Sequence, residues 1–82
     1  MSSQPVKFPM TEKQKKIFLF IQDYFNSEGV MPRQIDIANH FGITQQTLKS
    51  HLDNIQKRGW ITRLPGLSRS IRLNLDSFHP LN

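Results

Sequence analysis

Hydrophobic and polar residues follow a helical period in the first part of the chain. After Thr11 the apolar residues recur at helical spacing, and at about 100° per residue most of them share one broad arc. Those residues are Ile17, Phe18, Phe20, Ile21, Tyr24 and Phe25. Thr11 and Gln14 have the spacing of a capping box, so a first helix is predicted from Thr11 to Ser27. Leu19 lies opposite the arc and is expected to face water.

Two shorter helical patterns follow an extended stretch. The residue before Pro32 disfavours the α region, so the segment leading to this proline is expected to be extended. A second helix is predicted over Gln34–Phe41, and a third over Thr44–Arg58, which starts on a capping residue and stops at Gly59. The second helix has apolar positions for docking on the first: Ile35, Ile37, Ala38 and Phe41. The third has a stripe expected to be buried: Leu48, Leu52 and Ile55.

Three residues between these two helices have the spacing that a helix-turn-helix needs. Ala38 is small enough for close approach of the next helix, and Gly42 can adopt the positive φ that ends the helix before it. Leu48 then fills the angle between the two helices. The motif, in which two helices cross steeply through a short turn, is typical of DNA-binding proteins.

Beyond Gly59 the period changes from helical to two-residue. Polar and apolar residues alternate from Ser70 to Leu75, which predicts a strand with one buried face. Trp60–Leu64 is available as its partner, and Pro65–Ser68 provides the turn. The predicted fold is mainly α with a small β-hairpin, a three-helix winged helix-turn-helix. It would occupy residues 11–75, with a flexible arm over residues 1–10 and a short tail over residues 76–82.

Composition limits the chain to one small domain with a basic C-terminal half. The chain has 82 residues and a formal net charge of +5, which suggests a polyanionic partner. Six basic residues and one acidic residue, Asp53, lie between Lys49 and Arg72, whereas residues 1–48 hold five basic and four acidic residues. The chain has no cysteine, no apolar run long enough to span a membrane and no signal pattern, so a cytoplasmic protein is expected.

Catalytic and metal-binding patterns are not found. His40, His51 and His79 are scattered and lack acidic or thiolate companions at ligand spacing. The chain has no Ser-His-Asp pattern and no glycine-rich phosphate loop, and a domain of this size has little room for an internal active site. We therefore expect neither an enzyme nor a bound metal, cofactor or small-molecule substrate.

Two groups of polar residues are candidates for contacts with double-stranded DNA. The first lies near the start of the third helix and suits base edges, because glutamine pairs with adenine and lysine with guanine. Its members are Gln45, Gln46, Thr47, Lys49 and Ser50. The second suits phosphates, since arginine forks match phosphate oxygens. Its members are Thr44, Arg63, Ser68, Arg69 and Arg72. The alternatives are a solvated polar helix face for the first group and ordinary edge-strand charge for the second.

Several segments resemble the N-terminal DNA-binding domain of the LexA family of SOS-response repressors. The likeness covers about Met10 to Leu75, and the hairpin carries it most specifically. The matching segments are Met10–Phe18, Met31–Ala38, His51-Leu52, Lys57–Ile61, Gly66, Ser68-Arg69 and Ile71–Leu73. The resemblance implies an operator-binding domain. In the family, a separate C-terminal domain dimerises and carries the Ser/Lys dyad that cuts an Ala-Gly bond, and this chain is expected to lack that domain.

Local departures from the family predict a different operator. The stretch from Gly42 to His51 is one residue shorter than in LexA, and the family's typical Asn, Ala and acidic residues are replaced at Gln46, Thr47, Lys49 and Ser50. Arg33 stands where the family often places a capping Thr, so we expect that a helix cap is lost and that Arg33 binds phosphate instead.

The leading functional prediction is a small transcriptional regulator, a repressor that acts by occupying a promoter. Specific binding usually needs two half-sites, so a second copy or another protein on DNA is expected as a partner. The alternative is a winged-helix module that binds a regulator or a replication or recombination assembly. Leu19, Phe8 and Phe78 would then be its contact points.

Overall fold

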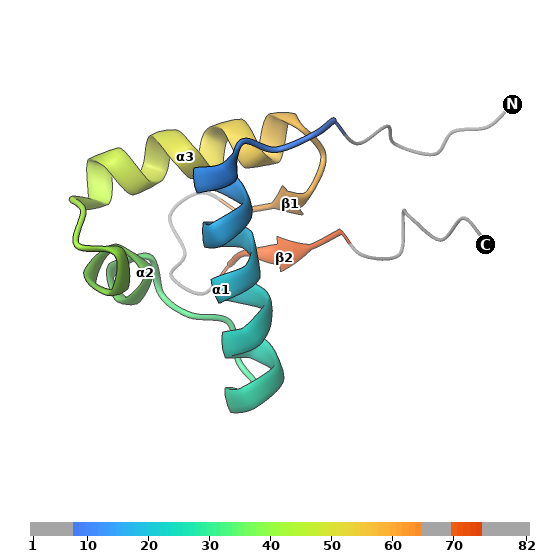
Figure 1. The fold of residues 1–82 in the computed structure, drawn as a ribbon. Coiled ribbons are helices and arrows are strands. Elements are labelled where there is room, and N and C mark those ends of the chain that lie inside the picture. The colour runs from blue at the N-terminus through green and yellow to red at the C-terminus, as the bar shows by residue number, and fades with distance from the viewer. Residues whose placement is uncertain (1–7, 65–69, 75–82) are drawn as a thin grey trace, which may run out of the picture.

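Three helices and a two-stranded antiparallel hairpin make up the fold (Figure 1). A computed structural model describes residues 8–64 and 70–74. The elements are α1 (Glu12–Glu28), α2 (Gln34–Phe41), α3 (Gln45–Lys57), β1 (Ile61–Thr62) and β2 (Arg72–Leu73). Ile61 pairs with Leu73 and Thr62 with Arg72. The prediction of a mainly α, winged helix-turn-helix fold is thus confirmed.

Capping residues fix where α1 begins and ends. The Gln14 amide donates to Thr11 Oγ1 at 3.2 Å, and the Thr11 amide donates to Gln14 Oε1 at 3.1 Å. This reciprocal capping box makes Thr11 the N-cap, so the helix proper begins one residue later than predicted. Gly29 ends α1 in the left-handed region with φ of 78°.

The turn between α2 and α3 follows the predicted helix-turn-helix geometry. Gly42 has φ of 66°, and the Ile43 amide reaches back to the Ala38 carbonyl at 3.0 Å, the hydrogen bond of a Schellman C-cap. Ala38 and Leu48 are both buried where the two helices meet. Thr44 is the N-cap of α3, and α2 has the bounds that the sequence predicted.

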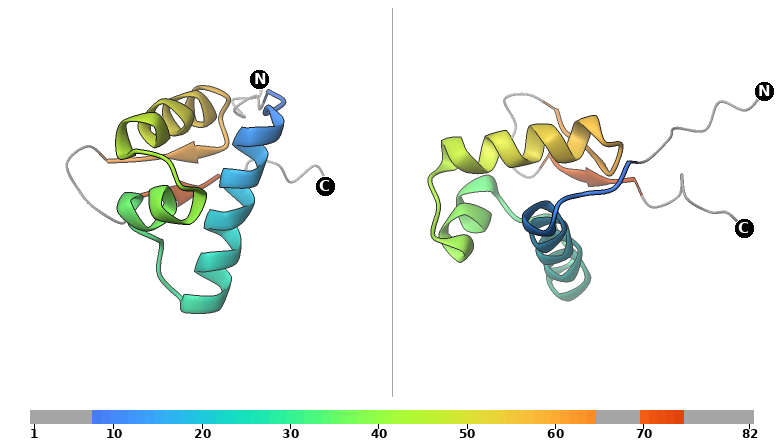
Figure 2. Two further views of the ribbon diagram at one scale, coloured as in Figure 1. Left: turned by 60° about the vertical axis from the view of Figure 1, so that its left-hand side comes forward. Right: turned by 45° about the horizontal axis from the view of Figure 1, so that its top comes forward.

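The core lies where the three helices and the hairpin meet, and α3 crosses α1 steeply near the N-terminal end of α1 (Figures 1 and 2). Its buried residues are Ile17, Phe18, Ile21, Ile37, Ala38, Leu48, Leu52, Ile55, Ile61 and Ile71. The predicted stripe of α3 is therefore confirmed. The Trp60 ring packs edge to face on Phe18, with centroids 5.4 Å apart.

Two apolar residues expected to be buried face solvent instead. Ile35 is 36% exposed, because it lies two residues and about 200° from buried Ile37 and cannot share its face. Phe25 is 41% exposed, in the last turns of α1, which extend beyond the elements that cover its first half (Figure 1). Leu19, predicted to face water, is 47% exposed.

The hairpin strands are shorter than the alternation predicted. Each strand has two residues, against the predicted Trp60–Leu64 and Ser70–Leu75, although the Asn74 amide also donates to the Trp60 carbonyl at 3.0 Å beside them. Two positions beyond the Thr62–Arg72 pair, a side chain replaces backbone pairing: Ser70 Oγ accepts from the Leu64 amide at 3.3 Å and donates to the Leu64 carbonyl at 3.0 Å. The predicted turn and Leu75 lie outside the described residues.

The N-terminal arm predicted over residues 1–10 is described only from Phe8. The Phe8 amide donates to the Arg58 carbonyl at 3.0 Å, and Trp60 Nε1 donates to the Phe8 carbonyl at 2.7 Å. Met10 packs against the core. The described end of the arm is thus docked against the C-terminal end of α3.

Candidate nucleic-acid interface

The residues predicted to read base edges share the exposed side of α3. Leu48, Leu52 and Ile55 hold the opposite side of this 13-residue helix in the core. The exposed residues in its N-terminal half are Gln45, Gln46, Thr47, Lys49 and Ser50. The structure therefore brings this predicted group together on a rigid element. Their contact with bases stays a prediction.

Thr44 uses its hydroxyl within the chain. Its Oγ1 accepts a hydrogen bond from the Thr47 amide at 3.0 Å and donates one to Thr47 Oγ1 at 2.9 Å. Because the single hydroxyl proton is engaged, the predicted phosphate contact of Thr44 competes with the interaction to Thr47. The Thr47 hydroxyl keeps its own proton, which it can donate outward.

Arg33 is the N-cap residue of α2, and Asp36 binds its side chain and its backbone amide. Its Nε and Nη2 donate to the two carboxylate oxygens of Asp36 at 3.1 and 3.0 Å, and its backbone amide donates to Asp36 Oδ2 at 3.2 Å. The hydrogen bond to Asp36 is the main cause that raises the pKa of Arg33. Asp36 thus binds the Arg33 amide in the loop before α2. The expected loss of a side-chain N-cap is confirmed, because no Arg33 side-chain atom accepts from the helix amides. A phosphate contact by Arg33 stays a prediction.

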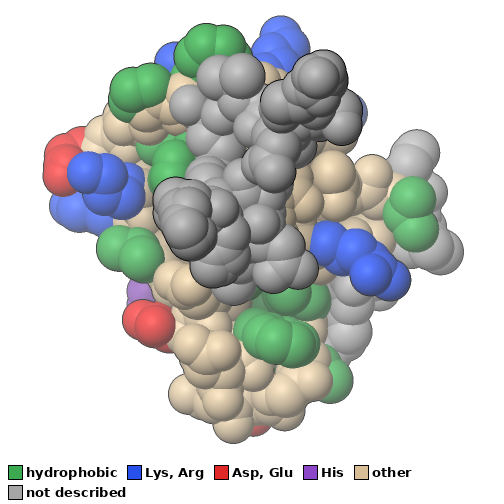
Figure 3. Space-filling model, turned by 90° about the vertical axis from the view of Figure 1, so that its right-hand side faces the viewer, with side chains coloured by type: hydrophobic (Ala, Val, Ile, Leu, Met, Phe, Trp, Pro, Cys, Tyr) green, Lys and Arg blue, Asp and Glu red, His purple; other side chains and the backbone are tan. Residues whose placement is uncertain are grey.

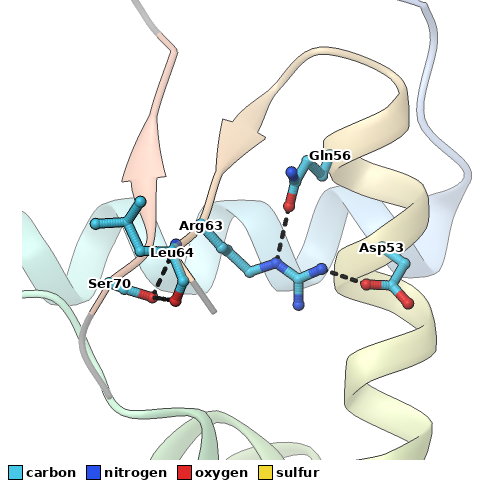
Figure 4. A network of polar contacts seen from close by, with 5 residues as sticks. All are labelled: Asp53, Gln56, Arg63, Leu64 and Ser70. Atoms are coloured by element: carbon cyan, nitrogen blue, oxygen red, sulfur yellow. Dashed lines mark hydrogen bonds and ion pairs between the residues drawn. The ribbon is translucent and has the colours of Figure 1, made fainter. Parts of the chain in front are cut away.

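The wing, defined as residues 61–64 and 70–73, presents its two arginines in opposite ways. Arg72 is exposed on β2, beside exposed Thr62. Arg63 follows β1 and turns toward α3 (Figure 4). Ser68 and Arg69, which were predicted to bind phosphate, lie outside the described residues.

Arg63 joins the wing to α3 through two side chains. Its Nε donates to Gln56 Oε1 at 2.9 Å, and its Nη2 forms an ion pair with Asp53 Oδ1 (Figure 4). The hydrogen bond from Arg63 is the main cause that lowers the pKa of Asp53, and the charges of Arg63, Lys49 and Lys57 act in the same direction. We call the contact among Arg63, Asp53 and Gln56 the wing bridge.

Sequence reasoning assigned no role to Asp53, Gln56 or Ser70. Their partners lie six to ten residues away across a change of secondary structure, and no helical or strand spacing rule connects them. One signal was present. Asp53 is the one acidic residue between Lys49 and Arg72, and such a carboxylate is a natural partner for a nearby arginine.

The predicted partner surface is only partly described. Phe8 is 54% exposed, Leu19 is also exposed, and Phe78 lies outside the described residues. On the face drawn in Figure 3, the visible hydrophobic side chains form several separate patches. That arrangement by itself favours no particular protein partner.

Metal ligands or a membrane span would indicate a different kind of function. Within residues 8–64 and 70–74, no three His, Asp or Glu side chains gather as metal ligands would. None of the helices described there is long and apolar enough to cross a membrane. His40 stacks on Phe20, with ring centroids 4.2 Å apart, and contacts Phe41 edge to face.

Comparisons with known proteins agree with the family resemblance seen in the sequence. The sequence model of the family described as LexA DNA binding domain matches residues 7–70. The chain is 44% identical over 64 residues to the LexA repressor of Thermosipho melanesiensis, covering 78% of this chain and 32% of that protein. It is 35% identical over 65 residues to the LexA repressor of Thermotoga maritima, covering 79% of this chain and 33% of that protein. For the LexA repressor of Verrucomicrobium spinosum the identity is 40% over 63 residues, covering 76% and 31%. The chain therefore spans about a third of the length of the curated relatives it matches.

Proposed function

Because this chain belongs to the LexA DNA-binding domain family, we propose that it binds specific sequences in double-stranded DNA and represses transcription by occupying promoters. The observation that carries the proposal is the exposed polar side of α3, whose other side is fixed in the core of a helix-turn-helix. Such a helix can enter the major groove with its first turns against base edges. The proposed role is binding without a catalytic step, in the cytoplasm and on bacterial or phage DNA.

Base contacts would come from the N-terminal half of α3. Gln46 suits the donor and acceptor pair of adenine, and Lys49 suits the two acceptors of guanine. Both side chains are exposed, and they lie on one side of the helix three residues apart. These two residues should therefore choose the sequence, together with Gln45, Thr47 and Ser50 beside them.

Phosphate contacts would orient the domain on the duplex. Arg72 is exposed on the wing, and Arg33 is exposed at the start of α2. Contacts of this kind add affinity and register but carry no sequence information. Because one domain makes few such contacts, we propose that two copies, or this chain and another DNA-bound protein, occupy adjacent half-sites.

The test is selection of bound duplexes from a random pool, followed by Kd measurements at several salt concentrations. We expect one enriched sequence and a Kd that weakens steeply as salt rises. Lys49→Ala should change the preferred sequence. Arg72→Ala should weaken all duplexes alike and reduce the salt slope by about 0.9, the value for one phosphate contact.

Lys13→Ala is the matched control, because Lys13 is an exposed lysine on α1 and belongs to neither predicted group of DNA contacts. It should leave the selected sequence unchanged. Negligible affinity for every duplex at low salt, with intact folding, would contradict the proposal. That outcome would favour the alternative function, a module that binds other proteins.

A further inference from the structure

The faces of the hairpin separate Arg63 from Arg72. Side chains alternate along a strand, and the pairing of Thr62 with Arg72 places these two exposed residues on one face. Arg63 follows by one residue, so it lies on the other face with buried Ile61. That face packs on α3. The two arginines therefore cannot serve one phosphate surface in the same way.

The Arg63 guanidinium is already engaged. Two of its three nitrogen atoms donate to α3, one to Gln56 and one to Asp53, and its side chain is only 14% exposed. Asp53 compensates its charge. A phosphate would compete with Asp53 for this charge, and it would bring a polyanion close to that carboxylate. The wing bridge is thus a poor phosphate site as it stands.

The wing bridge lies directly after β1, at the end of the paired strands. Arg63 directly precedes Leu64, and Leu64 is joined to Ser70 by both backbone groups through the Ser70 hydroxyl (Figure 4). These contacts link the two sides of the wing to each other and to α3. Asp53 also lies one helical turn after Lys49, a predicted base-reading residue.

We propose that Arg63 is a positioning residue, which sets the orientation of the wing relative to the base-reading part of α3 through Asp53 and Gln56. This inference rests on the proposed DNA-binding function. It replaces the sequence-based prediction that Arg63 binds phosphate. Phosphate contacts of the described wing are left to Arg72, and Arg63 contributes to affinity without touching DNA.

The experiment compares Arg63→Ala, Asp53→Asn and the double variant on the duplex that the wild-type chain selects from a random pool. We expect each single variant to weaken binding about two- to tenfold, the effect of losing one or two modest hydrogen bonds that hold the wing. The double variant should bind no more weakly than the weaker single. The salt slope of Arg63→Ala should equal that of the wild type, whereas the matched control Arg72→Ala should lower it by about 0.9.

A phosphate ligand would give a different result. Arg63→Ala would then lower the salt slope as Arg72→Ala does, and Asp53→Asn would bind equally well or more tightly, because it removes a negative charge and frees the arginine. Either result overturns the proposal, and so does unchanged affinity of Arg63→Ala.

Two further measurements keep the proposal testable if single variants lose stability. The exchanged pair, Asp53→Arg with Arg63→Asp, retains the net charge and should bind more tightly than Arg63→Ala. Weaker binding than Arg63→Ala would contradict the positioning role. In the absence of DNA, hydrogen exchange of the Leu64 amide should be faster in Arg63→Ala, while α1 amides exchange as in the wild type. If the wild type selects no duplex, the proposed function fails, but this exchange result still tests the wing bridge.

Discussion

The helix-turn-helix and the wing of this domain are held in place by different kinds of contact. Ala38 and Leu48 bury the junction of α2 and α3, and the turn between them is closed by backbone hydrogen bonds around Gly42. The wing is anchored in the core by Ile61 and Ile71, but its strands have only two residues each, and beyond them it is joined to α3 through polar side chains such as Arg63. Disrupting the buried junction should therefore unfold the domain, whereas disrupting these polar contacts should change DNA affinity with little loss of stability.

The largest effect is expected from Leu48→Ala. Leu48 is fully buried between α2 and α3, and truncating such a leucine typically costs about 2–5 kcal/mol of unfolding free energy. That is a large share of the roughly 5–15 kcal/mol that stabilises a small domain. Urea denaturation measures the loss of unfolding free energy, and Leu64→Ala in the wing is the control. Leu64 is exposed, and its truncation should cost less than about 0.5 kcal/mol. Equal costs would contradict the distinction between the two regions.

A smaller effect is expected from Gly42→Ala in the turn. A Cβ at this position would meet no atom within 4 Å, so the cost comes only from the positive φ of 66°. Placing alanine in that conformation costs about 1–2 kcal/mol. Gly42→Asn should cost less, because asparagine tolerates the left-handed region, and thermal melting compares the two. If the Gly42→Ala variant melted at the same temperature as Gly42→Asn, the backbone at residue 42 would have to relax out of its positive φ.

The smallest effect concerns acid stability of the wing bridge. The pKa of Asp53 is lower in the folded protein than its unfolded value of about 3.9, so the folded state binds the proton more weakly. The stabilisation by the Asp53–Arg63 ion pair is complete above the pKa that Asp53 has in the unfolded chain. It is lost as pH falls through the pKa that Asp53 has in the folded protein. Because Asp53 is about half exposed, we expect less than about 1 kcal/mol.

Unfolding free energies of the wild type and Asp53→Asn, measured from about pH 6 downward, test this expectation. The two curves should differ above the unfolded pKa and converge below the folded one. A difference that persists unchanged into acid would mean that the Asp53 carboxylate does not titrate with folding.

Local signals predicted the helical part of the domain. Thr11 and Thr44 cap the helices that they were expected to begin, and Gly42 ends α2 in the left-handed region. These features depend on residues only a few positions apart, so spacing alone reveals them. The same spacing placed Gln46 and Lys49 on the exposed side of α3.

The attachment of the N-terminal arm could not be derived in that way. Trp60 binds the Phe8 carbonyl across 52 residues of sequence, and no periodic pattern encodes such a contact. The orientation of Arg63 was within reach, because it stands two residues after Ile61 and a strand repeats its faces at that interval. The prediction grouped Arg63 with Arg72 by charge, although the alternation of strand faces puts them on opposite faces of the hairpin.

The hydrogen bonds around Trp60 have a consequence for engineering. The Phe8 amide donates to the Arg58 carbonyl at 3.0 Å. The Asn74 amide donates to the Trp60 carbonyl at 3.0 Å, and the Asn74 side-chain amide donates to the Gly59 carbonyl at 3.2 Å. Both described chain ends therefore meet at the C-terminal end of α3, about 20 Å of helix away from Gln45. A fluorescent tag or a fused effector attached at Phe8 or Asn74 would start at the end of α3 remote from the proposed base-reading residues. Fusion at either of these positions should therefore leave those residues uncovered.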